Sequence, residues 1–451
     1  MSEIAAIILA AGKGTRMKSD LHKVLHPIAG RPMLMHLMAS VDALSPARKV
    51  VVVGSGKEQL EAAFGKNGDC PYFSLQEPQL GTGHAVQMAE AALAGFDGDV
   101  IILPGDVPFV SATTMRAMID RLHEPDAPAV VVLGFEPDDT LKYGRIIAEN
   151  GIVSKMVEHK DATDAERQVR LCNGGQMAAR AKDLFPLLAR VDPESNAAKE
   201  YYLVDIVNIA NSDGRTCAVI DADPFETAGI NSRAELAMIE GEWQRRRRVR
   251  AMDDGATLIA PETVWFAYDT VLGRDVLIEP NVFFGPGVTV ADHAKIRANC
   301  HIEGAVIAEG CEVGPFARLR PGTVLEEKAK IGNFVEVKKA RFGKGAKANH
   351  LSYIGDADVG AKANIGAGTI TCNYDGYFKY QTVIGEGAFI GSNSALIAPV
   401  KIGRDAIVAA GSAVSRDVAD GELRMVRAEQ LVKPGWADRF HDAMRKKKGG
   451  K

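Results

Sequence analysis

Glycine, arginine and lysine residues near the start of the chain have types and spacing suited to binding phosphate. The segment LAAGKGTRM (9–17) contains Gly12 and Gly14, whose backbone amides can approach an anion with no side chain in the way. Arg16 adds a planar cationic fork, and Lys23 lies close enough in sequence to reach the same phosphates. Taken alone, this loop fits a tight strand-to-helix turn with a surface arginine equally well.

Further polar segments favour the phosphate-binding interpretation. QLGTGHA (79–85) is a second glycine-rich loop, and LPGDVP (103–108) places Asp106 after an apolar run. A carboxylate at such a strand end can hold Mg²⁺ on a nucleotide phosphate. CNGG (172–175) and GINS (229–232) supply amides able to bind sugar hydroxyls or to complete a metal shell.

His350 is a candidate general base in the second half of the chain. It lies beside Asn349, Ser352 and Tyr353, shortly before the polar segment 365–392. A lone histidine is more often structural. Histidine can, however, take a proton near neutral pH, as an amine attacking a thioester requires, and its place before this segment favours catalysis.

Alternating strands and helices must position the phosphate-binding residues. Apolar runs predict buried strands at Ile4–Leu9, Lys49–Val53, Val100–Pro104 and Ala129–Leu133, and helical patterns lie at Pro32–Leu44, Gly83–Leu93 and Ala112–Leu122. This alternation predicts a doubly wound, Rossmann-like α/β domain in about the first half of the chain. Such sheets bind ligands at the carboxyl ends of their strands.

A hexad repeat from about Ala256 to Val418 must position His350. Aliphatic residues return every six positions, in rows such as Ile278, Phe284, Val290, Ile296, Ile302, then Val313, Leu319, Leu325, Ile331, Val337, and later Ile384, Ile390, Leu396, Ile402, Val408, Val414. This period predicts a parallel β-helix with one short strand and a turn per hexad and three hexads per coil. A β-sandwich would instead show period-two alternation with hairpin turns. The break in the repeat predicts a loop extruded near residues 371–383.

A helical pattern at 232–253 connects the two regions, with Ser232 and Glu235 as a capping box. We therefore expect three parts: residues 1–231, the linker helix 232–253, and residues 254–451. The arginine run Arg245–Arg248 is interpreted as a solvated helix face rather than a phosphate site. The basic tail, ending in Arg445–Lys448, is expected to be partly disordered at its end.

Composition excludes several classes of protein. The chain has 451 residues, of which 46% are hydrophobic and 25% charged, as in ordinary soluble proteins, and its net charge of -4 argues against a general nucleic-acid binder. The six cysteines are scattered without a CxxC pair, which indicates reduced thiols in a cytoplasmic protein. The first residues do not form a signal peptide, and no segment approaches a membrane span.

The motifs resemble a known family. The pattern LxxGxGTRM, the downstream lysine, QxxGTGHA and the Gly-Asp pair resemble the sugar-nucleotide pyrophosphorylases. Together with hexapeptide repeats, the histidine and the IGAGTITCNYDG loop, they resemble the bacterial bifunctional N-acetylglucosamine-1-phosphate uridyltransferase / glucosamine-1-phosphate acetyltransferase family, from Leu9 to about Trp436. The resemblance implies a left-handed β-helix, a homotrimer with acetyl-CoA sites between subunits, and a route to cell-wall and envelope glycans. It also implies acetyl transfer from acetyl-CoA to glucosamine-1-phosphate, then uridylyl transfer from UTP with release of pyrophosphate.

The resemblance assigns roles to residues of the uridyltransferase half. It implies that Arg16 and Lys23 stabilise the transferring phosphate and that Asp106 and Asn231 ligate Mg²⁺. The residues implied to hold the nucleotide and the sugar are Leu9, Ala10, Ala11, Gly12, Lys23, Gln76, Gly81, Thr82, Pro104, Gly105, Asp106, Gly144, Glu158, Asn173 and Asn231, with Gly144, Glu158 and Asn173 on the sugar.

In the acetyltransferase half, the resemblance implies that His350 is the general base and that Glu336 helps to orient the base or the amine. The residues implied to bind the phosphosugar are Arg320, Lys338, Tyr353 and Asn364. Those implied to border acetyl-CoA are Ala367, Asn373, Tyr374, Ser392, Ala410 and Arg427.

Two departures from the family pattern and two other function classes stay open. Pro104 stands where the family often has tyrosine, and His22 where it usually has proline; because both neighbour contact residues without being the charged groups, we expect modest changes in affinity and intact chemistry. A single-activity sugar-1-phosphate nucleotidyltransferase could use the β-helix for assembly or regulation only. A purely structural trimerisation or ligand-binding module would leave Arg16, Lys23 and Asp106 without purpose.

Overall fold

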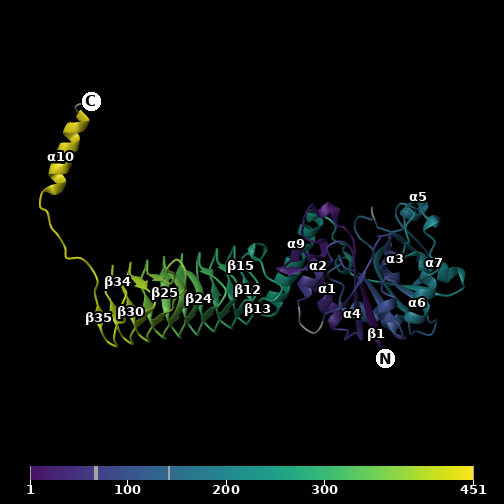
Figure 1. Cartoon of the computed structure of the whole chain (residues 1–451), viewed down its shortest axis with the longest axis horizontal. Helices are drawn as coiled ribbons and strands as arrows, with labels where there is room; N and C mark the ends of the chain where they lie inside the picture. The colour runs from purple at the N-terminus through teal and green to yellow at the C-terminus, as the bar shows by residue number, and fades with distance from the viewer. Residues whose placement is uncertain (1, 66–69, 141–142, 450–451) are drawn as a thin grey trace. The chain divides into compact units, whose positions relative to one another are not determined.

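The computed structural model describes residues 2–65, 70–140 and 143–449, which belong to two units, Met1–Arg245 and Arg246–Lys451 (Figure 1). The boundary lies inside helix α9 (Arg233–Asp253), where the sequence predicts a connecting helix. The capping box is present, because Ser232 Oγ accepts from the Glu235 amide at 3.2 Å and the Glu235 carboxylate accepts from the Ser232 amide at 3.1 Å.

A nine-stranded mixed sheet forms the centre of the amino-terminal unit. Its order is β5 (Tyr72–Leu75), β4 (Arg48–Val53), β1 (Ile4–Ala10), β6 (Asp99–Pro104), β10 (Cys172–Arg180), β7 (Val130–Phe135), β11 (Cys217–Asp221), β9 (Ile152–Val157) and β8 (Arg145–Glu149). Strand β1 pairs in parallel with β4 and β6, so the chain leaves these strands at one common edge. Strand β10 lies antiparallel between β6 and β7.

Helices cover both faces of this sheet. One apolar cluster joins the sheet to α1 (Met33–Asp42), α2 (Lys57–Phe64) and α4 (Ala112–Arg121), and another joins it to α3 (Thr82–Gln87), α6 (Ala181–Leu188) and α7 (Asp205–Ser212) (Figure 1). In β1, Ile8 belongs to the first cluster and Ile7 to the second, as expected of a strand buried on both faces. The smaller elements are η1 (Thr15–Met17), η2 (Lys23–Leu25), β2 (Pro27–Ile28), β3 (Arg31–Pro32), η3 (Ala91–Leu93), α5 (Asp164–Arg167), η4 (Pro193–Ser195) and α8 (Pro224–Thr227).

The predicted strands and helices of this unit are confirmed, with two differences. The helix predicted over Gly83–Leu93 ends at Gln87 and is followed by the short turn η3. The CNGG segment, for which no strand was predicted, opens β10, and its pairing with β7 shifts register between Asn173 and Met177. Its glycines and polar residues hide this strand from the sequence pattern, because strands are poor in both.

The carboxyl-terminal unit is the left-handed parallel β-helix, whose short strands stack coil upon coil (Figure 1). One sheet contains β12 (Thr257–Leu258), β14 (Leu277–Ile278), β17 (Lys295–Ile296), β20 (Glu312–Val313), β23 (Lys330–Asn333), β25 (Lys347–His350), β27 (Asn364–Ile365), β30 (Phe389–Ile390), β33 (Ile407–Val408) and β35 (Leu423–Arg424). The other contains β13 (Val271–Leu272), β15 (Phe283–Phe284), β16 (Thr289–Val290), β18 (His301–Ile302), β19 (Ala305–Ile307), β21 (Arg318–Leu319), β22 (Thr323–Leu325), β24 (Glu336–Phe342), β26 (Tyr353–Val359), β28 (Ile370–Cys372), β29 (Thr382–Ile384), β31 (Ala395–Ile397), β32 (Val400–Ile402) and β34 (Ala413–Val414). The turn η5 (Pro261–Thr263) lies in the first coil.

The hexad rows form the interior of the coils, as predicted. Ile278, Val313 and Ile390 are among the row positions with no exposed surface. The strand register also locates the extruded loop. Tyr353 pairs with Ile370, 17 residues on, whereas Ile370 pairs with Ala395, 25 residues on, so the extra residues lie between β28 and β29. The predicted loop near 371–383 is confirmed.

One expectation for a charged segment needs correction. Arg245 pairs with Glu242 at 2.7 Å on the helix surface, but Arg247 is half-buried, donates to the Thr270 carbonyl at 2.8 Å and lies 5.0 Å from the Phe266 ring centroid. The run is therefore only partly a solvated face. The tail forms helix α10 (Trp436–Gly449), which contains the basic run Arg445–Lys448; the end of the tail, expected to be partly disordered, includes residues 450–451, which lie outside the described ranges. Within those ranges, every helix is too short or too polar to cross a membrane.

Candidate functional site

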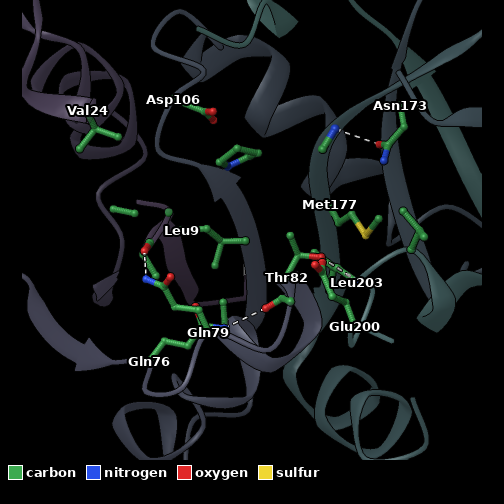
Figure 2. Close-up of a pocket in the computed structure, with 18 of the residues that line it drawn as sticks. Leu9, Val24, Gln76, Gln79, Thr82, Asp106, Asn173, Met177, Glu200 and Leu203 are labelled. Carbon is green, nitrogen blue, oxygen red and sulfur yellow. Dashed lines mark hydrogen bonds between the residues drawn. The ribbon is translucent and has the colours of Figure 1, made fainter. Parts of the chain in front are cut away.

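A cavity of about 470 Å³ lies in the amino-terminal unit at the carboxyl ends of β1 and β6, the edge where doubly wound sheets bind ligands. The predicted residues that line it are Leu9, Ala10, Ala11, Gly12, Lys23, Gln76, Gly81, Thr82, Pro104, Asp106, Glu158 and Asn173. Figure 2 shows Asp106 at one end of the view and Gln76 with Gln79 at the other, with Leu9 between them. These twelve residues, assigned by resemblance to the nucleotide and the sugar, thus share one cavity.

Lys23, predicted to bind phosphate, forms hydrogen bonds to both residues predicted to bind the metal. Its ammonium donates to the Asp106 carboxylate and, at 2.7 Å, to the side-chain oxygen of Asn231. Gly14 makes this approach possible, because its φ is 59° and a Cβ there would lie 2.6 Å from the Lys23 Cβ. Glycine at position 14 therefore serves the placement of Lys23 as well as the turn.

The oxygens of Asp106 and Asn231 fit a hard cation. One carboxylate and one amide oxygen converge on the same lysine nitrogen, and Mg²⁺ prefers oxygen ligands. Across residues 2–65, 70–140 and 143–449, no group of three histidine, cysteine or acidic residues could hold a metal by itself. The donors present fit Mg²⁺ carried on a nucleotide phosphate, which needs few protein ligands.

The predicted sugar residues Gly144, Glu158 and Asn173 lie together. The Asn173 amide donates to the Gly144 carbonyl at 2.9 Å, and a Cβ on Gly144 would lie 3.5 Å from a Glu158 carboxylate oxygen. Burial raises the pKa of Glu158, and the nearby carboxylates of Asp161 and Asp205 raise it further. This end of the cavity can offer hydrogen bonds to hydroxyl and amide groups.

The opposite end is built from the two glycine-rich loops. Gln76 is buried and donates through Nε2 to the Gly81 carbonyl at 2.9 Å, and the Thr82 hydroxyl accepts from the Leu203 amide at 3.0 Å. Gln79 donates to the Ala11 carbonyl and so ties the second loop to the first. The cavity residues that sequence reasoning did not single out are Val24, Gln79, Ala85, Gly175, Met177, Glu200, Leu203 and Val204. Gln79 lies within the QLGTGHA motif, which was the available signal.

Four predicted residues lie outside the cavity lining. Arg16 is exposed in η1, and Asn231 reaches the cavity through Lys23. The Gly105 amide donates to the Leu9 carbonyl at 2.8 Å, which holds the ends of β6 and β1 together, and Gly144 contacts Asn173. Of the two departures from the family pattern, Pro104 lines the cavity, whereas His22 is buried beside Gly56. Burial and the Lys23 charge lower the pKa of His22.

In the carboxyl-terminal unit, His350 is exposed at the end of β25 and is oriented by a neighbour one coil away. Asn333 Oδ1 lies 2.7 Å from His350 Nδ1, and the two residues are register partners in β23 and β25. Because an amide oxygen only accepts hydrogen bonds, the neutral ring places its proton on Nδ1 and keeps the lone pair on Nε2. This tautomer suits a general base. Asn333 was not singled out from the sequence.

Three cationic side chains, Arg320, Lys338 and Lys379, lie near strand β24, which precedes the strand that carries His350. Arg320 pairs with Glu336 at 2.8 Å, and Lys338 follows in the same strand, β24, as Glu336. Lys379, from the extruded loop, lies against Lys338 and lowers its pKa, as does Arg320. Two ammonium groups placed together favour a bound polyanion such as a phosphate. Sequence reasoning missed Lys379 because nothing local indicates which way a loop folds.

The extruded loop is closed by a backbone hydrogen bond and carries polar groups toward β26. The Tyr380 amide donates to the Asn373 carbonyl at 2.9 Å, closing the hairpin on itself. Asn373 Nδ2 donates to Asp356 and lies 3.5 Å from the Tyr353 hydroxyl. Tyr374 is exposed on this loop. The predicted phosphosugar residue Tyr353 and the predicted acetyl-CoA residue Asn373 are thus neighbours.

The other predicted acetyl-CoA residues follow one edge of the β-helix. Strands β27, β30 and β33 pair at Asn364, Phe389 and Ile407, and Ala367, Ser392 and Ala410 each follow three residues later. Ala367 accepts from Asn393, and Ser392 accepts from Gly411, at 2.7 and 2.8 Å. A Cβ on Gly411 would lie 3.7 Å from the Arg427 side chain, so Arg427 continues this edge.

Comparison with known proteins covers the whole chain. Residues 6–200 match the MobA-like NTP transferase domain, and residues 269–304 and 381–416 match the bacterial transferase hexapeptide (six repeats). The chain is 76% identical to the bifunctional protein GlmU of Sphingopyxis alaskensis over 99% of this chain and 98% of that one. It is 74% identical to GlmU of Novosphingobium aromaticivorans (100% and 99% covered) and 56% identical to GlmU of Zymomonas mobilis (98% and 98%).

A solved UDP-glucose pyrophosphorylase complexed with UDP-glucose covers 55% of this chain and 100% of its own length, at 20% identity and a TM-score of 0.44, a likeness too distant to add to the assignment. This chain carries a nucleotidyltransferase region followed by hexapeptide repeats, and it matches GlmU relatives over nearly their whole length. The chain therefore belongs to the family of the bifunctional protein GlmU.

Proposed function

We propose that the amino-terminal cavity is the uridylyl-transfer site and that the cluster around His350 is the acetyl-transfer site of this bifunctional enzyme. As a member of its family, the chain acetylates glucosamine-1-phosphate and then couples N-acetylglucosamine-1-phosphate to UTP. The observation that carries the first assignment is the convergence of Lys23, Asp106 and Asn231 at a strand-end cavity.

In uridylyl transfer, a phosphate oxygen of the sugar phosphate attacks the α-phosphorus of UTP and pyrophosphate leaves. Gln76, Gly81 and Thr82 bind the uridine, and the Leu9–Gly12 backbone follows the phosphates. Lys23 and Arg16 neutralise charge on the phosphates, and Gly144, Glu158 and Asn173 orient the sugar. Positioning and charge neutralisation supply the rate, and no side-chain nucleophile is needed.

We propose Mg²⁺ as the metal of this reaction, with Asp106 and Asn231 as its protein ligands. When bound, the ion neutralises phosphate charge during transfer. Lys23 lies between these two side chains, so its ammonium is placed to contact the same phosphates. Arg16 is exposed and follows the Gly14 turn, from which its side chain can reach a bound nucleotide.

In acetyl transfer, the amine of glucosamine-1-phosphate attacks the thioester carbonyl of acetyl-CoA. His350 Nε2 takes the proton that the amine loses, while Asn333 holds Nδ1–H. Arg320, Lys338 and Lys379 bind the sugar's phosphate, and Tyr353 and Asn364 hold its hydroxyl groups. Acetyl-CoA lies along Ala367, Asn373, Tyr374, Ser392, Ala410 and Arg427, and its thiolate leaves.

We further propose that the enzyme is a homotrimer assembled through the β-helix, in the cytoplasm, where acetyl-CoA and UTP are available. Phe316, Phe334 and Leu351 form an exposed apolar row on successive coils, with 48%, 55% and 63% of each residue exposed. Burying such a row in a subunit interface removes it from water. We retain the division into residues 1–231, 232–253 and 254–451 as the functional one.

Thiol release from acetyl-CoA with glucosamine-1-phosphate, and pyrophosphate release from UTP with N-acetylglucosamine-1-phosphate, test both assignments. His350→Ala should abolish the first and leave the second intact, and Asp106→Ala should do the reverse. If Asp106→Ala leaves pyrophosphate release unchanged, the cavity is not the uridylyl-transfer site. Wild-type enzyme without thiol release would reduce the β-helix to a scaffold.

A further inference from the structure

Arg145 carries a buried charge in an unusual setting. It stands at the start of β8, only 2% of it is exposed, and it is the largest of the fully buried side chains. Among the described residues no carboxylate lies within ion-pair distance of it, and none of the proposed roles above uses it. A buried charge without an anionic partner is costly, so its surroundings must supply other contacts.

Backbone carbonyls supply those contacts. One terminal nitrogen of Arg145 donates to the Tyr143 carbonyl and the other to the Arg167 carbonyl at 3.2 Å. Arg167 is the last residue of α5, where helix carbonyls lack partners within the helix. The side chain therefore ties the turn before β8 to the end of α5, and Nε is buried without a partner.

The segments that Arg145 joins form the sugar end of the cavity. Arg145 pairs with Cys172 across β8 and β10, and one hydrogen bond, from the Asn173 amide to the Gly144 carbonyl at 2.9 Å, follows it. The Tyr143 ring packs edge-on against Phe135 with centroids 4.9 Å apart. Gly144 is thus fixed on both sides: Arg145 holds the carbonyl of the preceding Tyr143, and β10 holds the carbonyl of Gly144 itself.

We propose that Arg145 is a positioning residue for the phosphosugar: it holds the Tyr143–Gly144 peptide so that Gly144 and Asn173 present a fixed surface to the sugar. Arginine suits this role because its planar fork reaches two carbonyls in different directions, whereas lysine is a single point charge. The inference rests on the proposed assignment of Gly144, Glu158 and Asn173 to the sugar. It adds a residue that cannot touch the substrate.

Steady-state kinetics of pyrophosphate release on the full-length enzyme separate positioning from a general loss of structure. Arg145→Lys and Arg145→Met should raise KM for N-acetylglucosamine-1-phosphate by about tenfold, the effect of misaligning one good hydrogen bond, with Lys milder than Met. KM for UTP and acetyl transfer by the other unit should stay at wild-type values.

Arg180 supplies a control at the other end of β10. It also donates to backbone carbonyls, those of Leu122 at 3.2 Å and Pro128 at 3.0 Å, and unlike Arg145 it pairs with a carboxylate, that of Asp183 at 2.6 Å; it lies far along the strand from Asn173. Arg180→Met should lower thermal stability as Arg145→Met does and leave both KM values unchanged. Equal changes in both KM values for the Arg145 variants, or a change in stability alone, would overturn the inference.

Asn173→Ala distinguishes failure of this inference from failure of the site assignment. If Asn173→Ala raises KM for the sugar phosphate and the Arg145 variants do not, Arg145 has no positioning role. If neither change affects that KM, the sugar end of the cavity has been assigned wrongly, and the inference falls with it.

Discussion

Replacing Gly14 by alanine should damage uridylyl transfer far more than it damages the fold. The residue has a φ of 59°, a conformation that costs alanine about 1–2 kcal/mol. The added Cβ would lie 2.6 Å from the Lys23 Cβ, whereas unbonded carbons rest about 3.5–4.0 Å apart. Lys23 must then retreat by roughly 1 Å, and its ammonium loses its place between Asp106 and Asn231.

A displacement of Lys23 by this distance should lower the rate of uridylyl transfer. Misplacing a positioning group by about 1 Å can cost roughly 100-fold in rate. We expect Gly14→Ala to lower kcat for pyrophosphate release by about 100-fold, with thiol release from acetyl-CoA unchanged. Both activities can be measured on the same preparation, so the acetyltransferase reports the fraction of folded enzyme.

Gly214→Ala is the matched control for backbone strain. Gly214 has a φ of 71° and nothing within 4 Å of the position where a Cβ would stand. This variant should lose about as much stability as Gly14→Ala and keep its kcat. If the two variants differ by less than about threefold in kcat, contact with Lys23 is not what Gly14 provides.

Three further outcomes follow from other contacts. Asn333→Ala should lower kcat for acetyl transfer by about tenfold without affecting pyrophosphate release, because His350 loses the partner that fixes its tautomer; equal activity would show that Asn333 is not the orienting group. Arg247→Met should lower the free energy of unfolding in urea by about 2 kcal/mol, because it removes the hydrogen bond to Thr270 and the contact with the Phe266 ring. Arg245→Met removes only a surface ion pair and should lower it by about 0.5 kcal/mol or less. Burial and Asp161 raise the pKa of Asp205 from its ordinary 3.8 to about 6, so the folded chain holds this proton more tightly and stability falls as pH rises between these values. Asp205→Asn should therefore stabilise the protein at pH 7.5 by about 1 kcal/mol, after allowance for solvent screening at this half-buried group, and the gain should vanish below about pH 4 in urea titrations; a gain that persists in acid would contradict the charge argument.

The β-helix could be predicted from sequence almost completely because its determinants are local. Each hexad places one aliphatic residue inside, so rows such as Ile278 to Ile302 identify buried positions without any long-range information. The break in the repeat likewise located the extruded loop. By contrast, β10 was missed because its pairing partners β6 and β7 contribute from far along the chain, and its own residues form a poor strand pattern.

The two candidate sites also differ in how much of each could be predicted from the sequence. Asp106 lies 83 residues after Lys23, and Asn231 lies 208 residues after it. Only the sheet, which brings strand ends to one edge, makes the three residues neighbours. The motifs named these residues by resemblance. They could not show that Gly14 contacts Lys23, or that the Arg145 side chain holds the carbonyl before Gly144. Such contacts depend on side-chain packing, which has no sequence period.

In the β-helix, proximity can be calculated from coil length. Three hexads make a coil of about 18 residues, and strands in this region pair 17 or 18 residues apart. Asn333 lies 17 residues before His350, so the partner of the candidate base could have been found by counting back one coil. Lys379 could not, because it lies in the inserted hairpin, where the count fails. A side chain on a regular coil of this solenoid can therefore be assigned its neighbours from the sequence, whereas the neighbours of a residue in the inserted hairpin cannot be counted in this way.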